Sequence, residues 1–188
     1  DLGNSRGKWL HVVDDAVVSE GAASLGELPS KLAFLPAKTQ LVVASVVAED
    51  REAALREHFL SKGWPAWFAR SPAALDGLAN GYGDAASLGV DRWLAMLGAW
   101  QRCRGEAVCV IDAGSALTID FIGRDGRHSG GYILPGAELM RRSLLSDTGR
   151  VRFEEAASGA VSQPGRSTAA AVNNGVRIFH GPLVESQR

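Results

Sequence analysis

Asp112-Ala-Gly-Ser-Ala116 follows a short apolar run at 107–111 and leads into Leu117-Thr-Ile-Asp-Phe-Ile122. Short runs of apolar and β-branched residues are typical of buried strands, and an Asp-x-Gly segment between two of them favours a tight turn. A related pattern stands at the start of the sequence, where Asp1-Leu-Gly-Asn-Ser5 precedes a strand-like run at 8–13. Each copy contains an acid, a glycine turn and a hydroxyl, so we predict a chain built from two related halves.

The residues after the second Asp-x-Gly segment predict two further strands and a helix. Arg124-Asp-Gly126 is typical of a hairpin turn, so the chain is expected to return antiparallel over 127–134. Pro135-Gly136 then opens a helical pattern over 137–145, where proline at the start of a helix does little harm. The second half is therefore expected to read strand, strand, strand, helix.

The remaining segments predict a mixed α/β protein. The helix expected at 91–104 has Trp93, Leu97 and Trp100 at helical spacing, which favours a buried stripe. Gly63 is expected to stop the helix that precedes it. The other expected elements are strands at 7–13, 17–19 and 41–47 and helices at 28–34, 50–62 and from Ser167-Thr168 onward.

Composition indicates a folded protein that binds neither nucleic acid nor membrane. Of 188 residues, 46% are hydrophobic, which is enough for a core without disulfides, and the net charge of −1 lacks the basic excess of duplex-binding proteins. The longest apolar stretch, 41–48, is far shorter than the roughly 20 residues of a membrane helix. Cys103 and Cys109 fit neither a disulfide framework nor a metal site, so a reducing cytoplasm is expected.

The two Asp-x-Gly segments suit phosphate binding. Glycine lets backbone amides approach a phosphate, and the hydroxyls of Ser5 and Ser115 can donate to it. A carboxylate in contact with phosphate is repelled, so Asp1 and Asp112 imply a cation or a water between acid and phosphate. A plain hairpin turn is the alternative for either segment alone, whereas the paired occurrence favours phosphate.

Gly89-Val-Asp91-Arg92 opens the helix expected at 91–104 and has two interpretations. In the first, Asp91 caps the helix and Arg92 is solvated. In the second, Asp91 accepts a proton from a substrate hydroxyl while Arg92 holds an anionic group of the same substrate. The second interpretation predicts a kinase that acts on a hydroxy acid.

Five motifs in order resemble type III pantothenate kinase, the family that includes the proteins named Bvg accessory factor. They are Asp-x-Gly-Asn-Ser at 1–5, Tyr82 seven residues before Gly-x-Asp-Arg at 89–92, Asp-x-Gly-Ser-Ala at 112–116, Gly-Gly-Tyr-Ile-x-Pro-Gly at 130–136 and Arg-Ser-Thr at 166–168. The resemblance covers nearly the whole chain. It implies the α/β fold of the acetate and sugar kinase, heat-shock chaperone and actin superfamily, with two ribonuclease H-like domains, each a mixed sheet with flanking helices, and a cleft between them.

The resemblance also predicts the domain organisation. We expect an N-terminal domain at 1–105, with the first phosphate loop and the pantothenate motif, and a C-terminal domain at 106–188, with the second phosphate loop. Family chains continue with a further glycine-rich strand and helix, so the second domain is expected to be truncated at its C-terminal end. Gly83-Asp84-Ala85 departs from the family, which often has a proline after the tyrosine.

Roles for individual residues follow from the resemblance. Asp91 matches the proton acceptor, Asp112 the ligand of a monovalent cation, and Ser115 a second ATP contact that is usually threonine. We expect Asp1 to hold Mg²⁺, directly or through water, and Arg92 to grip the substrate carboxylate. The first ATP phosphate loop comprises Asp1, Leu2, Gly3, Asn4, Ser5, Arg6, Gly7 and Lys8. The pantothenate contacts are Tyr82, Gly89, Val90, Asp91, Arg92 and Thr168.

The implied reaction is transfer of the γ-phosphoryl group of ATP to pantothenate, giving 4'-phosphopantothenate in the first step of coenzyme A biosynthesis. The resemblance implies K⁺ or NH₄⁺, Mg²⁺ with ATP, and a cytoplasmic homodimer. Two alternatives stay open: a sugar kinase or polyphosphate phosphatase of the same superfamily, and a non-catalytic regulatory relative. Retention of Asp91, Asp112 and both loop hydroxyls favours catalysis.

Overall fold

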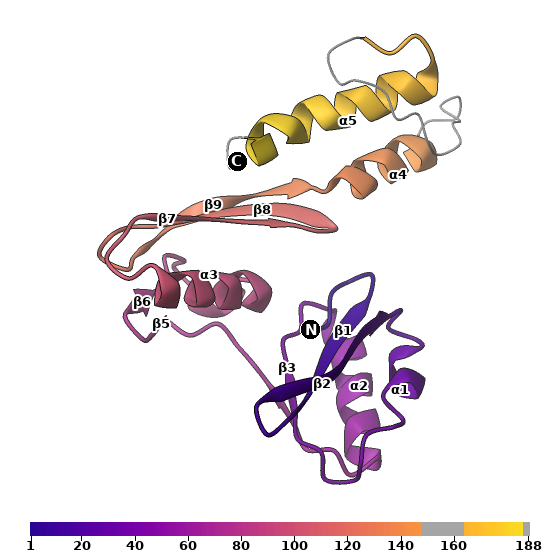
Figure 1. Ribbon diagram of the computed structural model, residues 1–188, viewed down its shortest axis with the longest axis vertical. Helices are drawn as coiled ribbons and strands as arrows, with labels where there is room; N and C mark the ends of the chain where they lie inside the picture. The colour runs from indigo at the N-terminus through magenta and orange to yellow at the C-terminus, as the bar shows by residue number, and fades with distance from the viewer. Residues whose placement is uncertain (148–163, 186–188) are drawn as a thin grey trace. The chain divides into compact units, whose positions relative to one another are not determined.

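The computed structural model describes residues 1–147 and 164–185 and shows a mixed α/β protein (Figure 1). By its internal contacts the chain divides into two compact units. The first unit comprises Asp1–Val110 with Asp120–Gly130, and the second comprises Ile111–Ile119 with Gly131–Arg188. The expected domain boundary between residues 105 and 106 stays a prediction.

The first unit begins with an antiparallel hairpin. Strands β1 (Gly7–Val13) and β2 (Ala16–Ala23) are joined by Asp14 and Asp15, which have φ angles of 49° and 61°. Two left-handed residues in succession are typical of the turn that matches the twist of a two-residue hairpin. Helix α1 (Leu28–Lys31) is shorter than the expected helix at 28–34.

A parallel β-α-β segment packs beside this hairpin. Strand β3 (Leu41–Val43) pairs with β4 (Ala66–Phe68), and α2 (Glu49–Ser61) connects them. The acidic first turn of α2 and Gly63 just beyond its end, at φ 71°, confirm the predicted start and stop. The strand expected at 41–47 ends already at Val43, and β4 was not predicted. The core here comprises Leu2, Leu28, Leu32, Val43, Leu55, Phe59, Trp64 and Phe68.

The rest of the first unit is organised around α3 (Val90–Arg102). A small hairpin of β5 (Ala74–Leu75) and β6 (Leu78–Ala79) precedes it, followed by the short 3-10 helix η1 (Ala85–Ser87). These three short elements were not predicted. The predicted stripe on α3 is confirmed, because its tryptophans are buried in a second core that comprises Leu78, Leu88, Trp93, Met96, Trp100 and Ile122.

Three strands and a helix follow in the predicted order. Strands β7 (Val108–Ala113), β8 (Ala116–Ile122) and β9 (His128–Pro135) form one sheet with β8 in the middle. The turn between β8 and β9 is closed at both ends, because Gly123 N donates to Arg127 O at 2.9 Å and Gly126 N donates to Gly123 O at 2.9 Å.

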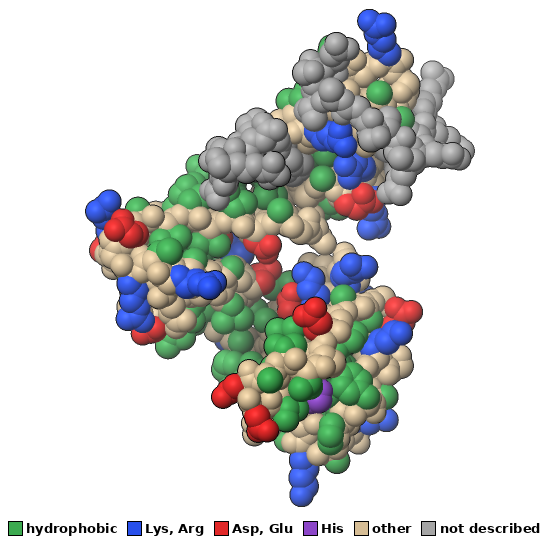
Figure 2. All heavy atoms as spheres, viewed as in Figure 1, with side chains coloured by type: hydrophobic (Ala, Val, Ile, Leu, Met, Phe, Trp, Pro, Cys, Tyr) green, Lys and Arg blue, Asp and Glu red, His purple; other side chains and the backbone are tan. Residues whose placement is uncertain are grey.

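Two helices complete the described chain. Helix α4 (Ala137–Asp147) contacts α5 (Thr168–Glu185) in the second unit, and Arg141 Nε donates to Asn173 Oδ1 at 3.0 Å. Ser167 caps α5 as predicted, because its hydroxyl accepts from Ala170 N at 3.2 Å. Within the described ranges, every helix is too short or too polar to cross a bilayer. On the face shown in Figure 2, acidic and basic side chains of the described residues are interspersed, in keeping with the net charge of −1.

Candidate functional site

The first Asp-x-Gly segment forms a tight turn that lies between the start of β1 and the residues that follow β3. Leu2 makes an antiparallel bridge to Gly7 and a parallel bridge to Ser45, so it is held on both sides. Gly3 N donates to Arg6 O at 3.2 Å, which closes the turn over 3–6. The predicted turn is confirmed, and it leaves the side chains of Asn4 and Ser5 exposed.

The second Asp-x-Gly segment forms a tighter turn between β7 and β8. Gly114 N donates to Ala116 O at 2.8 Å, and Asp112 and Ser115 are exposed. The residue before α4 packs directly on this turn, because Gly136 N donates to Ser115 O at 3.0 Å. A Cβ atom at Gly136 would lie 2.2 Å from Gly114 O, so only glycine fits there. This contact accounts for the glycine of the Pro-Gly motif.

The two acids of these turns have the chemistry that hard cations require. Asp1 and Asp112 are both exposed, and neither carboxylate has a hydrogen-bond or ion-pair partner among the described residues. The described residues contain no group of three or more potential metal ligands. Mg²⁺ in phosphate-transfer sites is held by one or two carboxylates together with substrate phosphates and waters. The exposed carboxylate at the first turn therefore has the donor chemistry that Mg²⁺ requires.

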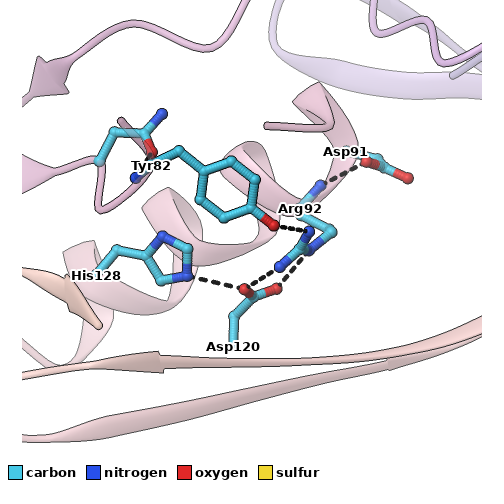
Figure 3. Close-up of polar contacts among 6 residues, drawn as sticks. Tyr82, Asp91, Arg92, Asp120 and His128 are labelled. Atoms are coloured by element: carbon cyan, nitrogen blue, oxygen red, sulfur yellow. Dashed lines mark hydrogen bonds and ion pairs between the residues drawn. The ribbon is translucent and has the colours of Figure 1, made fainter. Parts of the chain in front are cut away.

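Arg92 lies at the centre of a buried polar group in the first unit, which we call the Arg92 cluster: Tyr82, Arg92, Asp120 and His128 (Figure 3). The Arg92 guanidinium donates to Asp120 from Nε at 2.9 Å and from Nη2 at 2.6 Å. Its Nη1 donates to Tyr82 Oη at 2.9 Å. His128 Nε2 contacts Asp120 Oδ1 at 2.9 Å, and a carboxylate oxygen can only accept, so the imidazole is the donor.

Burial sets the electrostatics of the Arg92 cluster. Arg92, Asp120 and His128 are 6%, 1% and 3% exposed, respectively. The pKa of the Arg92 guanidinium is raised above its usual value, mainly by the hydrogen bonds to Asp120 and further by the bond to Tyr82, against the opposing effect of burial. The interpretation of Arg92 as a solvated side chain is therefore wrong: its charge is buried and compensated inside the protein.

Asp91 lies next to this cluster on the first turn of α3. Its Oδ1 accepts from Arg92 N at 2.7 Å, and its side chain is half-buried. The residue at the helix cap is Gly89, where a Cβ atom would come within 2.7 Å of Asp91 Oδ1. Glycine at this position thus leaves room for the carboxylate, and Asp91 is not itself the capping residue.

The loop that carries Tyr82 is fixed by hydrogen bonds to Asn80. Asn80 Nδ2 donates to Pro72 O and Ala85 O, each at 3.2 Å, and its Oδ1 accepts from Tyr82 N at 3.0 Å. Asp84 caps η1 by accepting from Ala86 N at 3.1 Å. The loop is therefore well defined by its own polar contacts, although the proline typical of the family after the tyrosine is absent.

Two members of the Arg92 cluster were missed by the sequence analysis. No role was predicted for His128, and Asp120 was predicted only as part of the strand-like run at 117–122. The available signal was the acid itself, because Asp120 interrupts the apolar run Leu117-Thr-Ile-Asp-Phe-Ile122 in a strand predicted to be buried. A buried carboxylate requires a partner, and Arg92 is that partner.

A cavity of about 760 Å³ opens beside the start of α3. Gly89 and Val90 form part of its wall, together with residues of α2 and the segment 69–71. Small-molecule sites typically occupy about 300–1,000 Å³. The structure brings Tyr82, Asp91 and Arg92 together in the first unit, but of the predicted pantothenate contacts only Gly89 and Val90 line this cavity. Asp112, Ser115 and Thr168 belong to the second unit.

A sequence profile described as "Type III pantothenate kinase" matches residues 1–187. The chain belongs to this family. A type III pantothenate kinase from Marinobacter nauticus is 37% identical over 189 residues, which cover 98% of this chain and 77% of the relative. Another type III pantothenate kinase, from Pseudomonas fluorescens strain Pf0-1, is 40% identical over 200 residues, covering 100% of this chain and 78% of the relative.

A solved structure supports the fold of this type III pantothenate kinase family member. It is that of a conserved putative Baf family transcriptional activator from Campylobacter jejuni, with a TM-score of 0.61 at 22% sequence identity. The match covers 100% of this chain and 77% of the solved one. At this identity the likeness concerns the fold alone.

Proposed function

We propose that this chain transfers the γ-phosphoryl group of ATP to the primary hydroxyl of pantothenate, the first step of coenzyme A biosynthesis. The observation that carries the proposal is the start of α3. There the buried Arg92 contacts Tyr82, and the neighbouring Asp91 carboxylate is half-buried. Gly89 and Val90, which immediately precede Asp91, line a cavity of about 760 Å³. Membership of the family identifies pantothenate as the substrate for which this arrangement is suited.

In the proposed reaction Asp91 accepts the proton of the pantothenate hydroxyl. As the hydroxyl oxygen attacks, a bond forms between it and the γ-phosphorus, and the bond from that phosphorus to the bridging oxygen of ADP breaks. The transferred phosphoryl group is already electrophilic. Most of the reduction in the activation barrier therefore comes from positioning the reactants and neutralising charge. Tyr82, the backbone at Gly89 and Val90, Arg92 and Thr168 orient pantothenate.

The two Asp-x-Gly turns are proposed to hold ATP. The first turn and Lys8 contact its phosphates, and Ser115 supplies a second hydroxyl donor. Asp1 is proposed to hold Mg²⁺, directly or through water, and Asp112 to hold K⁺ or NH₄⁺. These cations would neutralise phosphate charge during transfer.

The family also supports a wider proposal about architecture and location. We place each Asp-x-Gly turn in its own ribonuclease H-like domain of an actin-like fold, and the protein in the cytoplasm as a homodimer. The described cysteines, Cys103 and Cys109, are exposed and free of disulfides, which is compatible with a reducing compartment.

The decisive assay is ATP consumption with pantothenate in the presence and absence of K⁺ or NH₄⁺. Dependence on both pantothenate and the monovalent cation is expected. Turnover with sugars in place of pantothenate, or release of phosphate from polyphosphate, would support another enzyme of the superfamily. No turnover with any of these substrates would favour a regulatory relative.

Gly136→Ala is expected to raise the KM for ATP about tenfold, because the new Cβ would push the Asp112–Ala116 turn away from α4. The KM for pantothenate should change less than the KM for ATP. Gly98→Ala is the matched control: Gly98 lies within α3 with open space around its Cβ position, so alanine should stabilise the helix by about 0.5–1 kcal/mol. Steady-state kinetics with each substrate varied in turn make the measurement, and an unchanged KM for ATP would show that the turn tolerates the methyl group.

A further inference from the structure

We infer that Asp120 and His128 are positioning residues that hold Arg92 and Tyr82 in the orientation needed to bind pantothenate, an inference that rests on the proposed function. None of the five sequence motifs assigns a substrate role to either residue. Both lie on the hairpin of β8 and β9, and both are nearly inaccessible to solvent. Each acts through a neighbour that the family motif places at the substrate.

Asp120 fixes the plane and direction of the Arg92 guanidinium. Two parallel hydrogen bonds, from Nε at 2.9 Å and from Nη2 at 2.6 Å, occupy one edge of the guanidinium. Such paired bonds restrict rotation as well as supplying energy. Because this edge is occupied, the expected grip of Arg92 on the substrate carboxylate cannot use it. The edge that contains Nη1 is directed instead at the Tyr82 hydroxyl.

His128 connects Asp120 to the tyrosine ring (Figure 3). Its Nε2 donates to Asp120 Oδ1 at 2.9 Å, while its ring stacks on Tyr82 with centroids 5.9 Å apart and planes 15° apart. Its Nδ1 is buried with no hydrogen-bond partner among the described residues. A Cβ atom at Gly81 would lie 2.0 Å from His128 O, so the tyrosine loop and β9 are in close contact.

Stability alone does not account for these polar residues. The apolar core of Trp93, Met96, Trp100 and Ile122 already lies in the same unit and contains no ion pair. Replacing a buried ion pair by apolar side chains of similar volume is often neutral or stabilising. What the polar side chains add is a fixed geometry at Arg92 and Tyr82, the two cluster residues proposed to contact pantothenate.

Asp120→Asn is expected to raise the KM for pantothenate about tenfold while the KM for ATP stays within about twofold of the wild-type value. The substituted amide keeps one acceptor oxygen but presents an NH₂ group to a guanidinium donor, so one bond to Arg92 is lost. Steady-state kinetics with each substrate varied make the measurement. Ile122→Val is the matched control, because Ile122 is buried on the same strand, outside the Arg92 cluster, and its truncation should leave both KM values unchanged.

Two variants of His128 separate its contact with Asp120 from its contact with Tyr82. They also test the positioning role if Asp120→Asn does not fold. His128→Phe retains a ring against Tyr82 but cannot donate to Asp120, whereas His128→Gln retains an N–H donor but lacks the ring. Each is expected to raise the KM for pantothenate at least threefold, since positioning depends on both contacts.

Two contrary outcomes are distinguishable. Variants with a lower melting temperature but a wild-type KM for pantothenate would show a merely structural role and overturn the inference. In that case the proposed function stands, because the wild-type chain still phosphorylates pantothenate. A wild-type chain without pantothenate-dependent ATP consumption would instead refute the proposed function and this inference with it.

Discussion

Asp91→Asn lowers kcat by a factor of about 10²–10⁴, the usual contribution of a positioned general base, while the KM for pantothenate changes by less than about threefold. Asparagine keeps the size of the side chain and an oxygen that can accept from Arg92 N, so the start of α3 is preserved. What is lost is the capacity to accept the hydroxyl proton as the phosphoryl group is transferred. The measurement is the initial rate of ADP formation at saturating ATP over a range of pantothenate concentrations.

Asp50→Asn is the matched control for this variant. Asp50 also lies in the acidic first turn of a helix, α2, but it is exposed and outside the proposed substrate site. Its replacement should leave kcat unchanged. If Asp91→Asn retained the wild-type kcat, Asp91 would be removed from the role of proton acceptor, and the carboxylate would be one that only contacts the helix backbone.

Arg92→Ala is expected to destabilise the protein by about 3–5 kcal/mol and to lower its melting temperature by roughly 10 °C. The substitution leaves Asp120, only 1% exposed, without the cation that compensates its charge. It also removes the donor to Tyr82 Oη. Thermal unfolding followed by circular dichroism provides the measurement, and any loss of activity must then be assessed on the folded fraction.

Two further variants help to explain the loss of stability expected for Arg92→Ala. Arg124→Ala removes an arginine from an ion pair with Glu106 in which both side chains are about 70% exposed (75% and 68%), so it should cost less than about 1 kcal/mol. Arg92→Met combined with Asp120→Leu removes both buried charges and should recover most of the lost stability without restoring pantothenate binding. Equal melting temperatures for Arg92→Ala and Arg124→Ala would contradict the energetic importance of the buried pair.

The sequence was sufficient to predict those elements that are stabilised by contacts between neighbouring residues. The acidic first turn of α2 and Gly63 after it, the apolar stripe of α3 and the hairpin turn at Asp125-Gly126 all depend on contacts within a helix or a turn. The short strands β4, β5 and β6 escaped prediction, because strands of two or three residues form only where a partner strand is already in place.

The candidate site shows the same difference between features set by neighbouring residues and contacts between residues distant in the sequence. Two Asp-x-Gly turns and an Asp-Arg pair at a helix start could be predicted without coordinates, since each is specified by adjacent residues. The burial of Arg92 against Asp120, 28 positions away, and the stacking of His128 on Tyr82 became evident only from the folded structure. Partners so distant in sequence leave no periodic pattern, and the cost of burying a charge without a partner is what brings them together.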